Sequence, residues 1–159
     1  MSLYAVGVDL GTMQNAGAVP TRVSKTVTFT GAAGAGAVGT VALFTVTGDV
    51  QVTGLWIKCT TDMTEAGSSA TIGTGVTGAT GYFYGGMGIG QGARWFNGDG
   101  SWTTAAGGNL INDGSDHEGA ASISANILFT ITDQNVTGGV VTVYVNYIPL
   151  SAGASVVAA

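Results

Sequence analysis

Apolar and hydroxyl-bearing residues alternate through several short stretches of the chain, which is the pattern of half-buried β-strands. The first clear stretch covers residues 26–30, with the sequence TVTFT. Weaker stretches lie at 70–75 and 80–84, between polar segments. No stretch carries apolar residues at the three- and four-residue spacing of an amphipathic helix. The pattern therefore predicts an all-β chain.

Two β-branched runs, residues 40–47 and 50–59, are separated only by Gly48 and Asp49. Glycine at the first central position suits a type II′ turn, whose twist matches that of paired strands. We therefore expect the two runs to pair as a β-hairpin, followed by a polar loop over residues 60–69.

The last third of the chain predicts a second long hairpin, with strands at 122–132 and 140–148 and a turn over 133–139. One face of the later strand carries four large side chains: Val141, Val143, Val145 and Tyr147. The other face carries Thr142, Tyr144 and Asn146. Because successive side chains point to opposite faces of a strand, the two sets are expected on opposite faces of the sheet. Pro149 is expected to end the strand because it has no N–H to donate.

These elements predict a single-domain β-sandwich of about seven to eight strands, jelly-roll-like or Greek-key in topology. Residues 1–25 show no sustained period and are expected to form an extended N-terminal arm. The β-sandwich domain is expected to cover residues 26–150, with a long irregular insert, rich in glycine and aromatic residues, at 85–119. Residues 151–159 are expected to form a loose C-terminal tail.

The composition adds a hint about partners. Only 8% of the 159 residues are charged and 45% are hydrophobic, with a net charge of −5; an average globular protein has about 25% charged residues. Disorder needs low hydrophobicity and high net charge, and a membrane span needs about 20 consecutive apolar residues, so neither is expected. The first residues also lack the pattern of a signal peptide. A neutral polar surface is best tolerated against partners, which favours a subunit of an assembly.

The four basic residues are Arg22, Lys25, Lys58 and Arg94. They are too few for the cluster of phosphate contacts that nucleic-acid binding needs. The single cysteine, Cys59, excludes an intrachain disulfide and a cysteine-based zinc site. We expect it to be a small buried thiol.

Residues 34–39, GAGAVG, match the glycine pattern G-x-G-x-x-G of dinucleotide-binding loops. That loop needs a preceding strand and a helix that opens at its third glycine. The strand is present at 26–30, but the β-branched run at 40–47 is not helical. The motif therefore predicts a strand-to-strand connection, and we assign no cofactor.

His117 is the only histidine, and it lies in the acidic segment 112–118, NDGSDHE. Asp113, Asp116 and Glu118 carry oxygen atoms that suit calcium, but their spacing is not that of an EF-hand. A solvated acidic turn is the preferred interpretation, with a cation site as the alternative. We assign no catalytic, cofactor-binding or metal-binding residue, and we expect no enzymatic activity.

Five aromatic residues lie in or next to the insert: Tyr82, Tyr84, Trp95, Phe96 and Trp102. Burial in the core or at an interface is the preferred interpretation, because large aromatic side chains are usually buried. A sugar-binding platform is the alternative.

Six stretches together resemble small virion structural proteins of tailed bacteriophages, of the head (capsid) decoration type. They are residues 38–50 (VGTVALFTVTGDV), 59–62 (CTTD), 71–75 (TIGTG), 127–132 (ILFTIT), 136–139 (VTGG) and 143–151 (VYVNYIPLS). The resemblance covers about half of the chain, and the insert at 85–119 departs from it.

The resemblance implies a β-sandwich that attaches to the outside of a capsid as a homotrimer. It implies that the protein is made in the host cytoplasm and reinforces the shell through multivalent contacts with the major capsid protein. The alternative is a receptor- or glycan-binding module of a phage fibre or tail.

Overall fold

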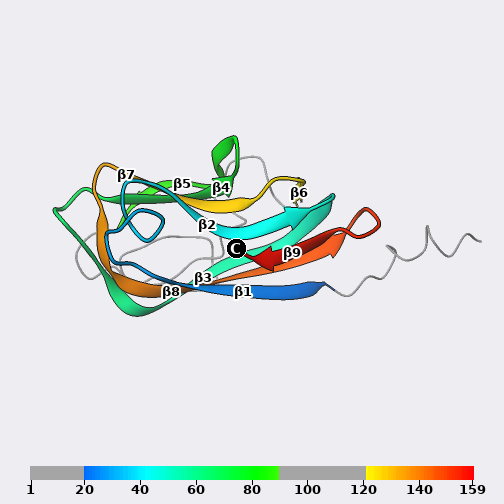
Figure 1. Ribbon diagram of the computed structural model, residues 1–159, viewed down its shortest axis with the longest axis horizontal. Helices are drawn as coiled ribbons and strands as arrows, with labels where there is room; N and C mark the ends of the chain where they lie inside the picture. Colours follow the sequence, from blue (N-terminus) through cyan, green and yellow to red (C-terminus); the bar gives the residue numbers. More distant parts are fainter. Residues whose placement is uncertain (1–19, 90–120) are drawn as a thin grey trace, which may run out of the picture.

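The computed structural model describes residues 20–89 and 121–159, whose strands build two facing sheets (Figure 1). The four-stranded sheet has the order β1-β8-β3-β6, and the five-stranded sheet has the order β5-β4-β7-β2-β9. The first contains β1 (Thr21–Thr28), β8 (Val136–Pro149), β3 (Val50–Glu65) and β6 (Ala121–Ile123). The second contains β5 (Ala79–Gly88), β4 (Thr71–Val76), β7 (Ile127–Thr132), β2 (Gly39–Thr47) and β9 (Ser155–Ala158). The described residues contain no helix, so the all-β prediction is confirmed.

The strand pairing follows a regular rule along the chain. β1 pairs with β8, β2 with β7, β3 with β6 and β4 with β5, each antiparallel. The first half of the chain therefore runs against the second half. Further pairings of β3 with β8 and of β4 with β7 complete the two sheets, and β9 adds to β2.

The core lies between the two sheets and is filled from the inner face of each. Phe29, beyond the end of β1, and Phe129 on β7 meet there with ring centroids 6.4 Å apart. On β8 the predicted alternation has a buried side, which consists of four large side chains: Val141, Val143, Val145 and Tyr147. The removal of these apolar surfaces from water is the main force that holds the layers together.

The first predicted hairpin is wrong, because β2 and β3 lie in different sheets. Gly48, with φ of 64°, and Asp49 carry the chain from one layer to the other. The turn is held by the residues after β8: Ser151 Oγ accepts the Asp49 N–H at 3.0 Å, and Asp49 O accepts the Leu150 N–H at 2.8 Å. The physical reason is that both edges of β2 pair with β7 and β9, while those of β3 pair with β8 and β6.

The second predicted hairpin is also wrong. The stretch 122–132 divides into β6 and β7, which lie in different sheets, and β8 returns to the sheet of β6. The break between β6 and β7 contains Asn126, whose Oδ1 accepts the Val46 N–H at 2.9 Å. The turn into β8 contains Asp133 in a left-handed conformation, with φ of 66°. Here the turn residues mark a change of layer rather than a reversal within one sheet.

Two boundaries differ from the predictions, and the strand count is nine in the described residues against the seven or eight expected. β1 begins at Thr21, so residues 21–25 belong to a strand rather than to the arm. β3 continues to Glu65, through most of the predicted loop 60–69. In both cases the local sequence is too polar to predict a strand. The backbone is nevertheless extended because it pairs with β8.

The expected loose tail at 151–159 is a further correction. Ser155–Ala158 forms β9, which pairs with β2, and Val156 is only 1% exposed.

Two other predictions are confirmed: β8 ends at Pro149, and the weak strand at 70–75 is β4. The strand expected at 80–84 is β5, which continues to Gly88. The remainder of the insert, from residue 90, lies outside the described residues.

Candidate functional site

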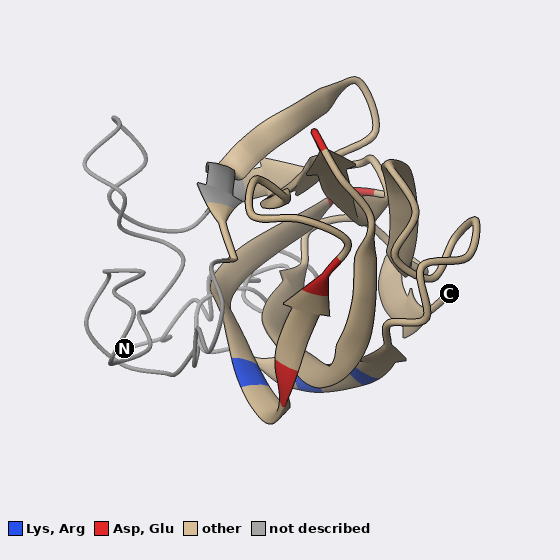
Figure 2. Ribbon diagram, turned by 90° about the vertical axis from the view of Figure 1, so that its left-hand side faces the viewer, with Lys and Arg blue, Asp and Glu red and all other residues tan. Residues whose placement is uncertain are grey.

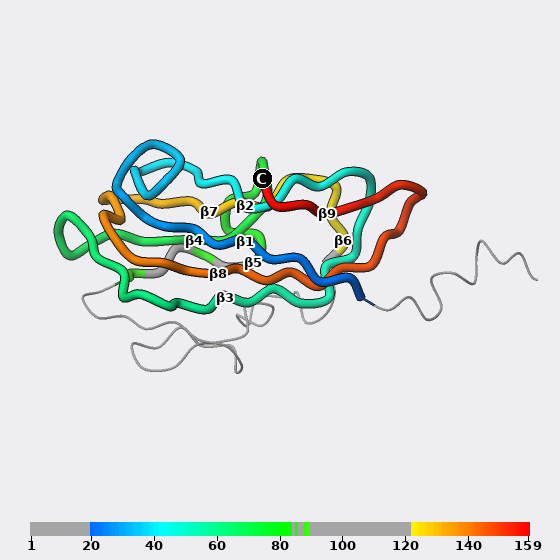
Figure 3. The backbone as a smooth tube through the Cα atoms, turned by 60° about the horizontal axis from the view of Figure 1, so that its bottom comes forward, coloured from blue at the N-terminus to red at the C-terminus, as the bar shows by residue number. Residues whose placement is uncertain are grey.

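The glycine motif at 34–39 lies in the connection between β1 and β2, as predicted, and a strand rather than a helix follows it. In Figure 3 this connection curls at the same end of the molecule as the turn between β7 and β8. The amides of Ala35 and Ala37 both donate to Ala32 O, at 2.9 and 3.0 Å. Gly36 O accepts the Val136 N–H at 2.7 Å. The backbone groups of the motif are thus engaged in holding the connection together.

The requirement for glycine at position 36 of this motif has a structural reason. It has φ of 118°, and a Cβ built on it would lie 2.1 Å from Val136 O. Only glycine permits both this backbone conformation and this close approach. The glycine is therefore required for packing against the start of β8.

Most of the other sequence-predicted candidates lie outside the described residues. These are His117 with the acidic residues of segment 112–118 (Asp113, Asp116 and Glu118), the aromatic residues Trp95, Phe96 and Trp102, and the side chain of Tyr84. Tyr82 is half-buried and packs edge-on against Phe83, with ring centroids 5.3 Å apart.

Cys59 is buried, as predicted, and its Sγ donates to Thr61 O at 3.0 Å. Within residues 20–89 and 121–159, no three His, Cys, Asp or Glu side chains come together as metal ligands. No helix in the same ranges is long and apolar enough to cross a membrane.

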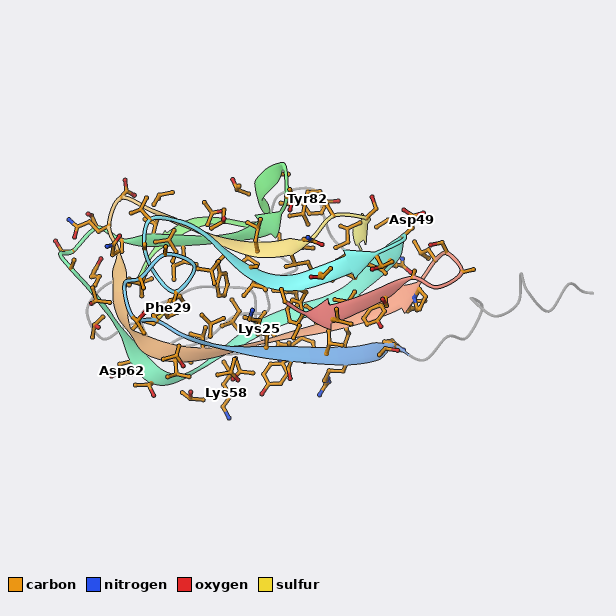
Figure 4. All side chains as sticks on the ribbon, in the orientation of Figure 1. Lys25, Phe29, Asp49, Lys58, Asp62 and Tyr82 are labelled. Atoms are coloured by element: carbon orange, nitrogen blue, oxygen red, sulfur yellow. The ribbon has the colours of Figure 1, made fainter. Side chains whose placement is uncertain are left out.

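The described charges are distributed unequally between the two sheets. The three described cations, Arg22, Lys25 and Lys58, lie on β1 and β3, and Figure 2 shows them along one side of the molecule. None of the five strands of the other sheet contains a charged residue. Lys58 points away from the facing sheet, whereas Lys25 points toward it (Figure 4). Arg22, two rows from Lys58 in the register, lies on the same outer face as Lys58.

Arg22 is held in place on this outer face by two contacts. Its Nε donates to Asn146 Oδ1 at 3.2 Å, and its Cζ lies 4.8 Å from the centroid of the Trp56 ring. A cation over an indole at an exposed site contributes about 0.5–1 kcal/mol. The two terminal nitrogens of the guanidinium have no partner among the described residues and remain available as donors.

Trp56 is fixed in turn by its neighbours across the sheet. It lies opposite Tyr144, and the two rings stack with centroids 5.6 Å apart and planes 13° apart. The indole also lies close over Gly54, where a Cβ would come within 3.0 Å of Trp56 Cζ3. The aromatic pair adds about 0.5–1.5 kcal/mol beyond its buried area. The glycine therefore makes room for the ring on the sheet.

Hydroxyl groups continue the face beyond the aromatic pair. Thr26 and Thr142 are opposite each other in the register, and their Oγ1 atoms are 3.0 Å apart. Lys58 lies opposite Thr142 on the other side. We refer to this surface of β1, β8 and β3 as the Arg22–Trp56 face. Its members are Arg22, Thr26, Trp56, Lys58, Thr142, Tyr144 and Asn146.

Only part of this face is predicted by the sequence. The alternation along the last long strand predicts that Thr142, Tyr144 and Asn146 share a face, but Arg22 falls in the expected arm and no pattern indicates a role for Trp56. The signal that unites the residues is the register of three strands, and no local pattern encodes that register. Chemically, the face offers positive charge, aromatic area and hydrogen-bond donors, which are groups suited to binding.

Comparison of the chain with protein-family models, with curated proteins and with solved structures finds no match.

Proposed function

We propose that this chain is a non-enzymatic virion structural protein that decorates and reinforces the outside of a bacteriophage capsid. The observation that carries the proposal is where the resembling stretches lie in the fold. Residues 38–50 include β2 and the crossing to β3, and 127–132 are β7. Residues 143–151 include most of β8. The resemblance to head decoration proteins thus falls on strands with a neighbour on each side.

The strand order supports a finer proposal for the fold. The order β1-β8-β3-β6 facing β2-β7-β4-β5 is what an eight-stranded hairpin gives when it is rolled into two layers. We therefore propose a jelly-roll sandwich with β9 as an additional edge strand. Viral capsid proteins and lectins both use this architecture, so it agrees with a virion protein by analogy of fold.

The mechanism we propose is multivalent attachment. Each subunit of a homotrimer contributes modest contacts to the major capsid protein, and the other two subunits are then held near their own sites. This raises the effective concentration and the total affinity without further contacts. The sparse charge of the chain, 8% of its residues, suits a surface largely covered by neighbours.

The number of copies per purified virion, measured by quantitative mass spectrometry against the major capsid protein, tests this function. We expect a count comparable to that of the shell subunit. A count of a few copies would favour a fibre, tail or neck protein instead. Absence from virions would contradict both structural functions.

The alternative is a receptor- or glycan-binding fibre or tail module. The stacked, half-buried rings of Trp56 and Tyr144 favour it, because such rings on an outer sheet face are a surface on which sugars pack. This alternative predicts few copies per virion and a sugar-dependent loss of adsorption in Trp56→Ala.

A further inference from the structure

We propose that the Arg22–Trp56 face is the surface by which this chain docks on the capsid, and that its partner is a protein surface that presents carboxylates. The inference rests on the proposed capsid function and names the face and the chemistry of the contact. Arg22 and Lys58 are the groups that would receive the carboxylates, with Trp56 and Tyr144 as the apolar contact between them.

The first argument is charge complementarity. The whole chain carries a net charge of −5, yet β1 and β8 contain no acidic residue. Neither Arg22 nor Lys58 has a carboxylate partner among the described residues. None of the described carboxylates is a member of the face: Asp49 and Asp133 lie in turns, and Asp62 and Glu65 lie further along β3, near its end. Since opposite charges steer and orient an encounter, an anionic partner would meet this face first.

The second argument is the fixed position of Arg22. The indole and Asn146 hold its guanidinium, so less side-chain entropy is lost when a ligand binds. Nε is already engaged, and the two terminal nitrogens have no partner within residues 20–89 and 121–159. A carboxylate matches such a fork with two parallel hydrogen bonds.

The third argument is composition. Arginine, tryptophan and tyrosine are the residues that most often dominate protein–protein binding energy, and here one of each is in mutual contact or stacked. The threonines Thr26 and Thr142 extend the surface toward Lys58. Two cations are too few for the phosphates of a nucleic acid. A protein carboxylate is the anion that fits a flat sheet face of this kind.

The first experiment measures the attachment of variant chains to virions. Arg22→Gln removes the charge and the fork, Arg22→Lys retains the charge only, and Lys58→Gln removes the second cation. Thr45→Glu is the matched control, because Thr45 is exposed on β2 of the other sheet and the change also lowers the net charge by one. Copies per virion are counted after washes at increasing salt concentration.

We expect about tenfold weaker attachment for Arg22→Gln, a smaller loss for Arg22→Lys and Lys58→Gln, and no loss for Thr45→Glu. Each purified variant should remain folded and unfold cooperatively in urea, with only a small shift of the midpoint for Arg22→Gln because it loses the contact with Trp56. Native-like occupancy of both Arg22→Gln and Lys58→Gln would overturn the docking face.

The second experiment separates the two proposals. A photo-crosslinking amino acid replaces Thr26 on the Arg22–Trp56 face or Thr45 on the opposite sheet, and crosslinked peptides are identified in purified virions. Crosslinks from position 26 to an Asp- or Glu-containing peptide of the shell protein support the inference. Crosslinks to the shell from position 45 alone overturn it and leave the decoration function standing. A native chain absent from virions overturns both.

Discussion

Lys25 Nζ donates a hydrogen bond to Ala42 O, 2.9 Å away on the opposite sheet. The same nitrogen donates to Ala159 O at 2.5 Å, just beyond β9. Lys25 lies on β1, which is an edge strand of its sheet, and Ala42 lies on β2. One side chain therefore joins the two layers where their edges come together.

Replacement of Lys25 by methionine should destabilise the protein. Lys25→Met retains most of the apolar stem but leaves two backbone oxygens without their charged donor. We expect the free energy of unfolding to fall by about 1–2 kcal/mol, measured by urea denaturation. Lys58→Met is the control, because Lys58 is exposed and without a partner in the described part of the chain, and it should change stability by less than about 0.5 kcal/mol. Equal losses in the two variants would contradict the bridging role.

The pair Gly36 and Gly34 tests the close approach in the connection between β1 and β2. Both have positive φ, but a Cβ on Gly34 meets nothing within 4 Å, whereas one on Gly36 meets Val136 O. We expect Gly34→Ala to cost about 1–2 kcal/mol and Gly36→Ala to cost at least about 3 kcal/mol. Thermal unfolding followed by circular dichroism compares the two. A difference of less than about 1 kcal/mol would mean that the backbone moves aside at little cost.

The pair Val156 and Val157 tests whether β9 is part of the folded domain. Val156 is 1% exposed and Val157 is 52% exposed. We expect Val156→Ala to cost about 2 kcal/mol, since it removes buried methyl groups, and Val157→Ala to cost less than about 0.5 kcal/mol. Denaturant midpoints measure both. Indistinguishable midpoints would restore the original expectation of a loose tail.

Two N-terminal deletions separate the arm from the sheet. Deletion of residues 1–19 should leave the domain folded, because it keeps every described strand. On the hypothesis that an extended arm contacts a neighbouring subunit, we expect fewer copies of this variant per virion. Deletion of residues 1–25 removes Thr21–Lys25, five of the eight residues of β1, and with them the Lys25 bridge. We expect this second product to be unfolded or insoluble, as judged by circular dichroism and gel filtration. Full occupancy by the 1–19 deletion would remove the arm from the attachment mechanism.

The sequence predicts the fold class and which residues of a strand share a face, but it does not predict which strands pair with each other. Alternation alone places Val141 and Val143 on the same face of their strand, because side-chain direction along a strand is a local property, and the structure shows that this face is buried. The turn at Gly48 was also correctly located, yet its strands belong to different layers. Strand pairing depends on which edges and faces the whole domain needs to cover, and a local pattern cannot specify that choice.

The same limit explains why the sequence predicts the Arg22–Trp56 face only in part. Arg22 and Trp56 lie on strands that do not touch each other, with β8 between them. Their contact requires two registers, β1 against β8 and β8 against β3, to be correct at once. A shift of one residue in either register would turn the side chains of that strand to the other face.

The strand pairing has a consequence for how the chain reaches its fold during synthesis. Only one pair of described sheet neighbours, β4 and β5, is consecutive in sequence. β1 pairs only with β8, so it cannot pair until β8 has been synthesised. A domain dominated by such distant pairings folds slowly, on the order of milliseconds to seconds. The reason is that the entropy of closing long loops is lost before the contacts that stabilise the fold have formed. While the chain emerges from the ribosome, the edges of β1, β2 and β3 remain unpaired until residues 121–158 have been made. This is the interval in which aggregation competes with folding, and at which a chaperone would act.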